Sequence, residues 1–267
     1  MAWTKYLKPI KYLDYTKRRI LDSKIQSKKP LIINTPFENE IIHFSVTSHK
    51  ELWRANASFT REPLTIDWIC NYVGNNDIIM DIGANVGAYS LLIAKMKKKS
   101  LVYAIEPESS NFFALNRNII VNGFQEKIIP LCVALGEKNT INSLYLSNIE
   151  PGSALHGLET PESEGVDFAP KHVQGIAEYK LDNLVEELEH KHINHLKIDV
   201  DGFEDRVVKG GINLLKNKYC KTVLIESYES TIGYIREVLE HSGFLEKKRN
   251  EILMPSGRGY NILYLKR

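Results

Sequence analysis

The sequence predicts an α/β fold, with one mostly parallel, doubly wound sheet of seven strands. Apolar runs alternate with helical patterns from residue 77 onward, and a second set of such segments follows an irregular stretch. The chain then closes with two strand-like segments joined through Pro255, Gly257 and Gly259. The alternation is typical of βαβ units in a parallel sheet, and the closing segments predict a C-terminal antiparallel hairpin.

The predicted strands of the sheet are the apolar runs, and the predicted helices lie between them. In chain order the segments are DIIMDIG, VGAYSLLIAKM, LVYAIEP, ESSNFFALNRNIIVNG, KIIPLCVAL, HLKIDV, FEDRVVKGGINLLKN, TVLIESY, TIGYIREVLEHSG, LEKKRNEILM and GYNILYLKR. Upstream, EIIHFSV alternates as a strand does, and FTREPLTIDWICNYV reads as an amphipathic helix with Pro63 in its first turn.

These patterns divide the chain into two parts. Residues 1–60 are expected to form a basic extension of a helix and strands, and residues 61–267 the sheet domain. An irregular stretch at about 147–176, rich in glycine, proline and acids, is expected to form an insertion above the ligand crevice.

Composition excludes several classes of protein. The 267 residues are 43% hydrophobic, which suits a packed core. Cys70, Cys132 and Cys220 lie far apart, so neither a disulfide framework nor a thiolate zinc site is predicted. No run of 18 apolar residues and no signal-like N-terminus occurs, so we expect a cytoplasmic protein.

Positive charge is concentrated at the N-terminus. Residues 1–30 contain nine Lys or Arg against two acids, although the whole chain has a net charge of only +2. Apolar residues at helical spacing favour one packed helix with a solvated basic face. The same arm could meet an anionic membrane surface, a nucleic acid or a phosphorylated glycolipid.

A glycine turn between a predicted strand and a predicted helix marks the ligand site. Gly83 and Gly87 lack a Cβ, so the backbone can turn tightly and a ligand can approach the helix N-terminus. Glu106 ends the next strand, where a carboxylate typically accepts hydrogen bonds from ribose hydroxyls. A nucleotide-like ligand is therefore predicted.

The charges around this turn favour S-adenosylmethionine. Asn85 occupies the place of the middle glycine in a dinucleotide motif, so a nicotinamide cofactor fits poorly. Asp81 would repel a pyrophosphate but attract an ammonium or sulfonium group, and S-adenosylmethionine carries both. Its carboxylate can use the helix N-terminus. S-adenosylhomocysteine would then be the product.

Three blocks of the sequence resemble the signature blocks of the FkbM family of S-adenosylmethionine-dependent methyltransferases. They are MDIGANVGAYS, AIEPESSNFFALNRNI and LKIDVDGFEDRVVKGG, and the resemblance covers roughly residues 60–228. It implies a Rossmann-like class I methyltransferase fold and O-methylation of a hydroxyl on a sugar, glycolipid or polyketide-type product. It assigns family roles to Asp81, Gly83, Gly87, Glu106 and Asp199.

Further cofactor-binding residues are expected beside these: Asn85, Pro107 and Ala134. Asp201 stands where the family commonly has Glu, which keeps the charge and shortens the side chain.

The expected catalytic residues are Asp199, Glu226 and His156. Asp199 and Glu226 close two strands of the predicted sheet, so both carboxylates should emerge near the transferred methyl, and Asp199 is preferred as base or acceptor clamp. His156 lies in the insertion. Asp199 could instead cap the following helix. The presence of Glu204 in the first turn of a predicted helix is accounted for by its favourable interaction with the helix dipole. Lys197 is interpreted as a solvated charge at the edge of the sheet. No metal site is predicted, although a histidine of the insertion could, with Asp199 and Glu226, help to hold a divalent metal.

Three alternative functions stay open. An RNA ribose 2′-O-methyltransferase is weakly suggested by Asp199, Lys209 and Glu226, although nucleic acid is not the expected partner. The others are a non-catalytic cofactor-binding module and a nicotinamide oxidoreductase. The preferred partner is a hydroxyl-bearing acceptor, a glycan or glycolipid. The sequence does not determine the oligomeric state.

Overall fold

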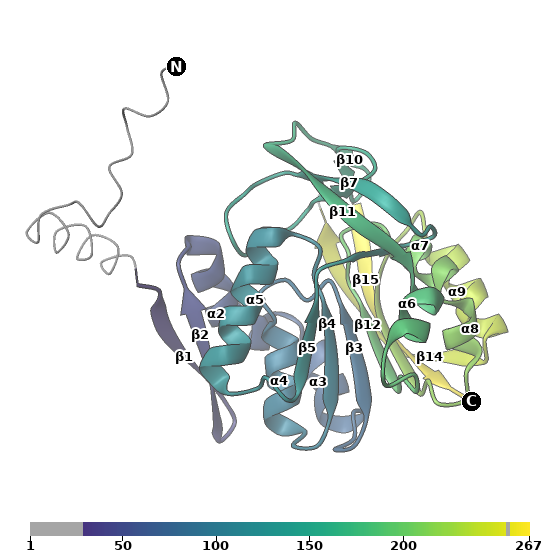
Figure 1. The fold of residues 1–267 in the computed structure, drawn as a ribbon. Coiled ribbons are helices and arrows are strands. Elements are labelled where there is room, and N and C mark those ends of the chain that lie inside the picture. Colours follow the sequence, from purple (N-terminus) through teal and green to yellow (C-terminus); the bar gives the residue numbers. More distant parts are fainter. Residues whose placement is uncertain (1–28, 255–256) are drawn as a thin grey trace, which may run out of the picture.

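The computed structural model describes residues 29–254 and 257–267, so the predicted N-terminal basic helix lies outside the described residues. Its centre is a seven-stranded sheet (Figure 1). In spatial order the strands are β14 (Phe244–Met254), β15 (Gly257–Lys266), β13 (Thr222–Tyr228), β12 (His195–Ile198), β3 (Ile78–Ile82), β4 (Leu101–Ile105) and β5 (Ile128–Leu131). No helix in the described part of the chain is both long enough and apolar enough to cross a bilayer.

The strand directions confirm the predicted fold class. The five strands from β13 to β5 run parallel, whereas β15 pairs antiparallel with β13 and with β14. The chain order reverses between β3 and β12, so the crevice at the carboxyl ends of these two strands is where a ligand is expected in a doubly wound sheet.

Helices cover both faces of the sheet because its buried strands are apolar on both sides. Ile79 packs in the core under one helix layer, and the next residue, Met80, packs in the core under the other. The first layer contains α3 (Pro63–Asn71), α4 (Ala88–Met96) and α5 (Ser109–Asn122). The second contains α6 (Leu181–Glu187), α7 (Glu204–Gly210), α8 (Ile212–Lys216) and α9 (Ile232–His241).

The segment before residue 61 packs on the same core. The strands β1 (Leu31–Phe37) and β2 (Glu40–Val46) form an antiparallel hairpin, and α2 (His49–Arg61) follows. Phe44 of β2 is buried in one cluster with Leu91 and Leu115 of the sheet domain, so the hydrophobic core is continuous across residue 60. The single helix expected at 59–73 is two helices, because Pro63 starts α3 immediately after α2 has ended.

The stretch expected to be irregular contributes strands to a second sheet. That sheet has the order β6 (Ala134–Gly136), β11 (His172–Lys180), β7 (Thr140–Leu146) and β8 (Gly157–Leu158). A small hairpin of β9 (Glu162–Ser163) and β10 (Val166–Asp167) lies between β8 and β11. The stretch is not irregular, because β7 pairs with residues about 30 positions away, from Leu146 opposite His172 onward, and no local pattern reveals this pairing.

The turn after β3 is locked between two strand ends. The N–H groups of Gly83 and Ala84 both donate to the carbonyl oxygen of Ile105, at 3.0 and 2.9 Å, and Asp199 N–H donates to the carbonyl oxygen of Ile82 at 3.0 Å. Gly83 has φ +83°, and a Cβ there would lie 1.7 Å from the Asp199 carbonyl oxygen. The missing side chain therefore makes room for the neighbouring strand end, as well as allowing the turn.

We expect Gly83→Ala to destabilise the fold far more than Gly123→Ala. Both glycines have positive φ, but a Cβ at Gly123 has no atom within 4 Å. Left-handed backbone costs alanine about 1–2 kcal/mol at each site, and the clash with Asp199 adds about 1–3 kcal/mol at Gly83 alone. Urea unfolding of the two variants measures the difference. Equal losses of stability would contradict the close approach.

Candidate active site

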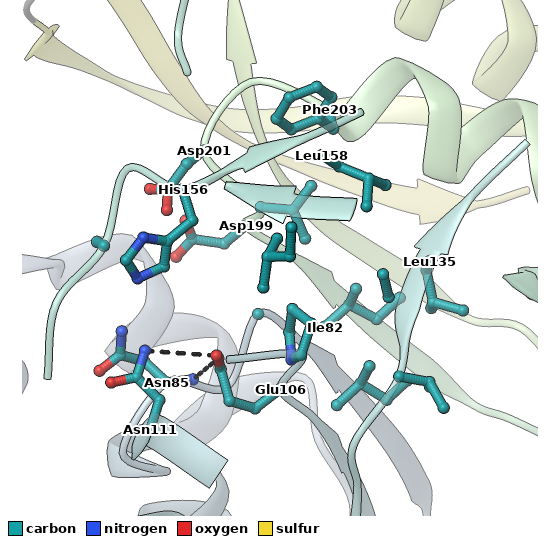
Figure 2. A pocket seen from close by; sticks show the side chains of 18 of the residues that line it. Ile82, Asn85, Glu106, Asn111, Leu135, His156, Leu158, Asp199, Asp201 and Phe203 are labelled. Carbon is teal, nitrogen blue, oxygen red and sulfur yellow. Dashed lines mark hydrogen bonds between the residues drawn. The ribbon is translucent and has the colours of Figure 1, made fainter. Parts of the chain in front are cut away.

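A pocket opens at the carboxyl ends of β3, β4 and β12, where the fold places its ligand crevice (Figure 2). It encloses about 750 Å³ of space, including the part open to solvent. Seven of the predicted site residues line it: Gly83, Asn85, Glu106, Pro107, Ala134, His156 and Asp199. Asp81, Gly87 and Glu226 are not among the lining residues.

Glu106 lies on the pocket floor as a buried carboxylate that accepts backbone hydrogen bonds. Asn85 N–H donates to its Oε2 at 2.8 Å, and Glu108 N–H donates to its Oε1 at 2.9 Å. Only 4% of the residue is exposed. Burial raises the pKa of Glu106 to about 7, although these donors oppose the rise. The side chain is thus held in one place and can change protonation near neutral pH.

Two asparagines connect this floor to residues 150–158, which cover the pocket and which we call the roof. The side-chain amides of Asn85 and Asn111 both donate to the carbonyl oxygen of Ser153, at 2.7 and 3.0 Å. Asn111 also accepts from Gly152 N–H at 2.7 Å. The sequence did not identify Asn111 as a site residue. It lies in the first turn of α5, and only its burial to 1% exposure distinguishes it from an ordinary helix residue.

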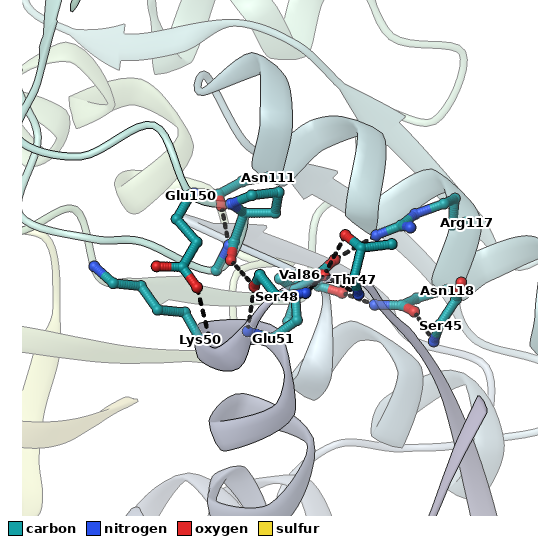
Figure 3. A network of polar contacts seen from close by, with 12 residues as sticks. Ser45, Thr47, Ser48, Lys50, Glu51, Val86, Asn111, Arg117, Asn118 and Glu150 are labelled. Carbon is teal, nitrogen blue, oxygen red and sulfur yellow. Dashed lines mark hydrogen bonds and ion pairs between the residues drawn. The ribbon is translucent and has the colours of Figure 1, made fainter. Parts of the chain in front are cut away.

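The N-terminal helix α2 holds the same roof segment from the other side (Figure 3). Ser48 caps the helix and its hydroxyl donates to the Pro151 carbonyl oxygen at 2.6 Å. His49 N–H donates to Glu150 Oε1 at 3.0 Å, and Arg54 Nε donates to the Gly152 carbonyl oxygen at 3.1 Å. The position of residues 150–153 therefore depends on α2, which lies before the part of the chain that carries the signature blocks.

Asp201 fastens the roof to the end of β12. Its Oδ2 accepts from Leu155 N–H at 2.7 Å, and its carbonyl oxygen accepts from Glu164 N–H at 3.1 Å and from the Ser163 hydroxyl at 3.0 Å. Asp201 has φ 57°, a left-handed conformation that aspartate tolerates. The residue that departs from the common Glu of the resembled block thus ties the insertion down over the pocket.

Asp199 is paired with a buried lysine. Lys197 Nζ donates to Asp199 Oδ2 at 2.7 Å, and Lys197 is only 4% exposed. Although burial favours the neutral acid, the Lys197 ammonium lowers the pKa of Asp199. Asp199 is therefore an anion at neutral pH, with about a quarter of its side chain exposed to the cavity side.

The interpretation of Lys197 as a solvated edge charge was wrong. Lys197 sits on a strand with neighbours on both sides, opposite Asp81 of β3 and Leu224 of β13. Burial alone would lower the pKa of Lys197, but the carboxylates of Asp199 and Asp81 raise it. Lysine in a fully buried strand is rare unless it is paired with acids, and that signal could have identified it.

Asp81 is placed beneath the glycine turn and away from the cavity. It is 1% exposed, and Ser90 Oγ donates to its Oδ2 at 2.6 Å. Burial raises its pKa, while the ammonium of Lys197 opposes that rise. The structure thus gives Asp81 the lysine as its nearest cation. The sequence could not show that Asp81 faces Lys197, because a carboxylate at the end of a strand was expected to point at the ligand.

Glu226 and Glu204 are buried acids beside the site. Glu226 is 9% exposed and accepts from the Tyr228 hydroxyl at 2.7 Å. Burial, and then the charges of Asp199 and Glu204, raise the pKa of Glu226 well above its ordinary value, so it is not a ready base. Glu204 accepts from Val200 N–H at 2.9 Å and from Gly202 N–H at 3.2 Å, and burial raises its pKa to about 8. Glu204 therefore shapes the turn after β12.

His156 enters the pocket from the roof and faces Asp199 and Asp201 (Figure 2). Its Nδ1 accepts from Ser147 N–H at 3.3 Å, which leaves the proton on Nε2. Nε2 has no hydrogen-bond partner within residues 29–254 and 257–267. Burial, and then Lys50 and Arg54, lower the pKa of His156 to about 4, so the ring is neutral at pH 7. His172 is exposed on β11.

The part of the chain that the structure describes contains no group of three or more His, Cys, Asp or Glu side chains placed to hold a metal ion. The pocket is lined by hydrogen-bonding and charged side chains together with apolar ones.

Comparisons with known proteins identify related chains. The family model described as the methyltransferase FkbM domain matches residues 81–246. The hexuronic acid methyltransferase AglP of Haloferax volcanii is 29% identical over 174 residues, 65% of this chain and just under two thirds (66%) of that protein. Methyltransferase sdnD of Sordaria araneosa is 26% identical over 241 residues, 80% of this chain and 90% of that one. A crystal structure of methyltransferase FkbM from Methylobacillus flagellatus has a TM-score of 0.48 and 17% identity, covering 78% of this chain and 46% of that one.

We expect Asp201→Ala to loosen the roof without unfolding the sheet. The charge-assisted bond from Leu155 N–H is lost, so amide hydrogen exchange over residues 150–158 should accelerate by about 10- to 100-fold. Asp167→Ala, at an exposed position of the same insertion, is the matched control. If exchange in the two variants is the same, Asp201 does not hold the roof.

Proposed function

Because the chain belongs to the FkbM methyltransferase family, we propose that it is an S-adenosylmethionine-dependent O-methyltransferase whose reaction takes place between Glu106 and Asp199. One observation carries this proposal. A fixed carboxylate at the end of β4 and an ionised carboxylate at the end of β12 line one pocket at the switch point of the sheet. The family supports methyl transfer, and the pocket supports the choice of cofactor and of residues.

The pocket fits a purine nucleoside with a positively charged tail. Glu106 is placed to accept hydrogen bonds from the two ribose hydroxyls, and Pro107, Ala134 and Leu135 offer an apolar wall beside it for the base. Asp199 lies at the other end of the pocket and favours a sulfonium group by its charge. Asp81 supports this arrangement indirectly, because its charge helps to keep Lys197 and therefore Asp199 ionised.

When bound, S-adenosylmethionine supplies an electrophilic methyl group on a sulfonium centre. Asp199 accepts a hydrogen bond from the acceptor hydroxyl, orients its oxygen and takes up its proton as the oxygen is methylated. His156 Nε2–H is available to donate to a second oxygen of the acceptor. The roof held by Asn85, Asn111 and Asp201 keeps water from the reacting atoms.

We further propose that the acceptor hydroxyl belongs to a sugar of a glycan or glycolipid. The name of one relative, hexuronic acid methyltransferase, supports a sugar acceptor. A pocket whose mouth is lined by carboxylate, imidazole and guanidinium groups suits a polyhydroxylated acceptor better than an apolar one. Action in the cytoplasm remains our prediction from the sequence.

Cofactor affinity should depend on the protonation of Glu106. The ribose hydroxyls donate to the carboxylate form, so binding releases a proton and affinity rises as the pH rises through about 7. Below that value S-adenosylhomocysteine should bind up to about tenfold more weakly per pH unit. Calorimetric titration across this range measures the slope.

The variant Glu106→Gln should bind S-adenosylhomocysteine weakly and lose most of this pH dependence. Glu162→Gln, at an exposed position of β9, should behave as the parent protein does. NAD serves as a comparison ligand. Binding of NAD in preference to S-adenosylhomocysteine would contradict the proposed function.

Asp199→Asn should lower kcat by about 10²- to 10⁴-fold and leave the affinity for S-adenosylhomocysteine within about threefold of the parent value. The amide keeps the shape of the side chain but cannot take a proton. Release of S-adenosylhomocysteine with sugar acceptors gives the rate, and calorimetry gives the affinity. The opposite pattern, weak binding with unchanged turnover, would move Asp199 from catalysis to cofactor binding.

A further inference from the structure

A second cavity adjoins the first at Asp199. The two share the lining residues Arg54, Gly83, Asn85 and Asp199, so they lie next to each other at the glycine turn. The second cavity is lined by α2, by the start of α4 and by Lys197. Its outer wall is made by Trp53, Arg54 and Arg61. This wall lies upstream of the residues matched by the family model.

The two arginines of this wall are held by an aromatic ring and not by acids. The guanidinium carbons of Arg54 and Arg61 lie 5.6 and 5.0 Å from the ring centroid of Trp53, whose exposed fraction is 48%. Arg54 also donates through Nε to the roof carbonyl of Gly152 at 3.1 Å. Counting described residues only, neither guanidinium has a carboxylate oxygen within 4.0 Å.

The two acids that line the same cavity are already engaged. Glu62, which lines the same cavity, accepts from the Thr65 hydroxyl at 2.9 Å. Asp199 is paired with Lys197 at 2.7 Å, and the two arginines act on its pKa only at longer range, where they lower it after Lys197 has done so. Among the described residues, therefore, Arg54 and Arg61 border the space next to Asp199 without a carboxylate partner of their own.

We propose that the acceptor carries an anionic group, a carboxylate or a phosphate, and that Arg54 and Arg61 bind this group while Asp199 binds the hydroxyl to be methylated. The inference rests on the proposed methyl transfer and adds the substrate class. The anionic group is not altered: the carbon–sulfur bond of the cofactor breaks, the new carbon–oxygen bond forms at the hydroxyl, and the hydroxyl proton passes to Asp199.

The carboxylate on the methionine part of the cofactor would be a second anion in this space, and we expect it to bind a different group of the protein from the acceptor's anion. The helix α4 begins at Gly87 without a side-chain cap, and Val86, Ala88 and Tyr89 at its start line the second cavity, so we assign the methionine carboxylate to this helix N-terminus. Arg61 is exposed and belongs to the last turn of α2, at the outer wall. The arginine pair is thus positioned for the acceptor, and a test must separate the two anions.

The experiment is calorimetric titration of the protein saturated with S-adenosylhomocysteine, using D-glucuronate, D-glucose 6-phosphate and D-glucose as probes. We expect at least one of the two acids to bind at least about tenfold more tightly than glucose. Arg61→Gln should weaken binding of the acid by about 10- to 100-fold and leave affinity for S-adenosylhomocysteine unchanged. Arg61→Lys should restore part of the loss.

The control is Arg249→Gln, which removes an arginine paired with Glu246 on the exposed side of β14. It should match the parent protein. Comparing glucuronate with glucose 6-phosphate identifies which anion the wall prefers.

Three results would overturn the inference: equal binding of acid and glucose, no binding of either acid, or weaker binding of S-adenosylhomocysteine in Arg61→Gln. The last would assign the arginine to the methionine carboxylate. Failure of the parent protein to bind S-adenosylhomocysteine would instead refute the proposed function, so the two failures are distinguishable.

Discussion

The close approach of two strand ends, Gly83 of the first βα turn and Asp199 after β12, is the constraint on which the site depends. Only a residue without a Cβ can sit against the Asp199 carbonyl, and the hydrogen bond from Asp199 N–H to Ile82 locks the register. The same turn presents Asn85 N–H to Glu106. One backbone contact therefore sets the separation of Glu106 and Asp199, the carboxylates that we propose for ribose binding and for catalysis, because both are held relative to it.

A line of buried charge runs beneath this contact. Asp81 of β3 and Asp199, just after β12, both interact with Lys197 of β12, and the attraction of its ammonium for each carboxylate offsets the cost of removing these groups from water, although the two carboxylates repel each other. As a result, the carboxylate of Asp199 stays ionised at the mouth of a largely apolar pocket. The nearby Glu204 and Glu226 have the opposite character, since burial without a cation raises their pKa values. These four acids thus differ in character because only Asp81 and Asp199 have a lysine near enough to act on their pKa values.

The roof joins parts of the chain that are far apart in sequence. Residues 150–155 are bound by Ser48 and Arg54 of the N-terminal segment, by Asn111 of α5 and by Asp201 after β12. Because α2 both supports the roof and carries Trp53, Arg54 and Arg61, a change in this helix acts on the shape of the pocket and on its charge together. The segment ahead of the signature blocks therefore lines the pocket and supports its shape.

Alternation and glycine spacing are local properties of the chain, so they were enough to predict the fold class, the seven-strand sheet with its terminal hairpin, and the residues at the strand ends. The second sheet, the placement of Lys197 and Asp81 against each other, and the roles of Asn111 and Asp201 were decided only by tertiary structure. Each of these depends on pairing between distant segments, and the burial that pairing produces has no local signature. A pattern shows which side chains a strand can present, but the neighbouring strand decides whether such a side chain meets water, a ligand or a counter-ion.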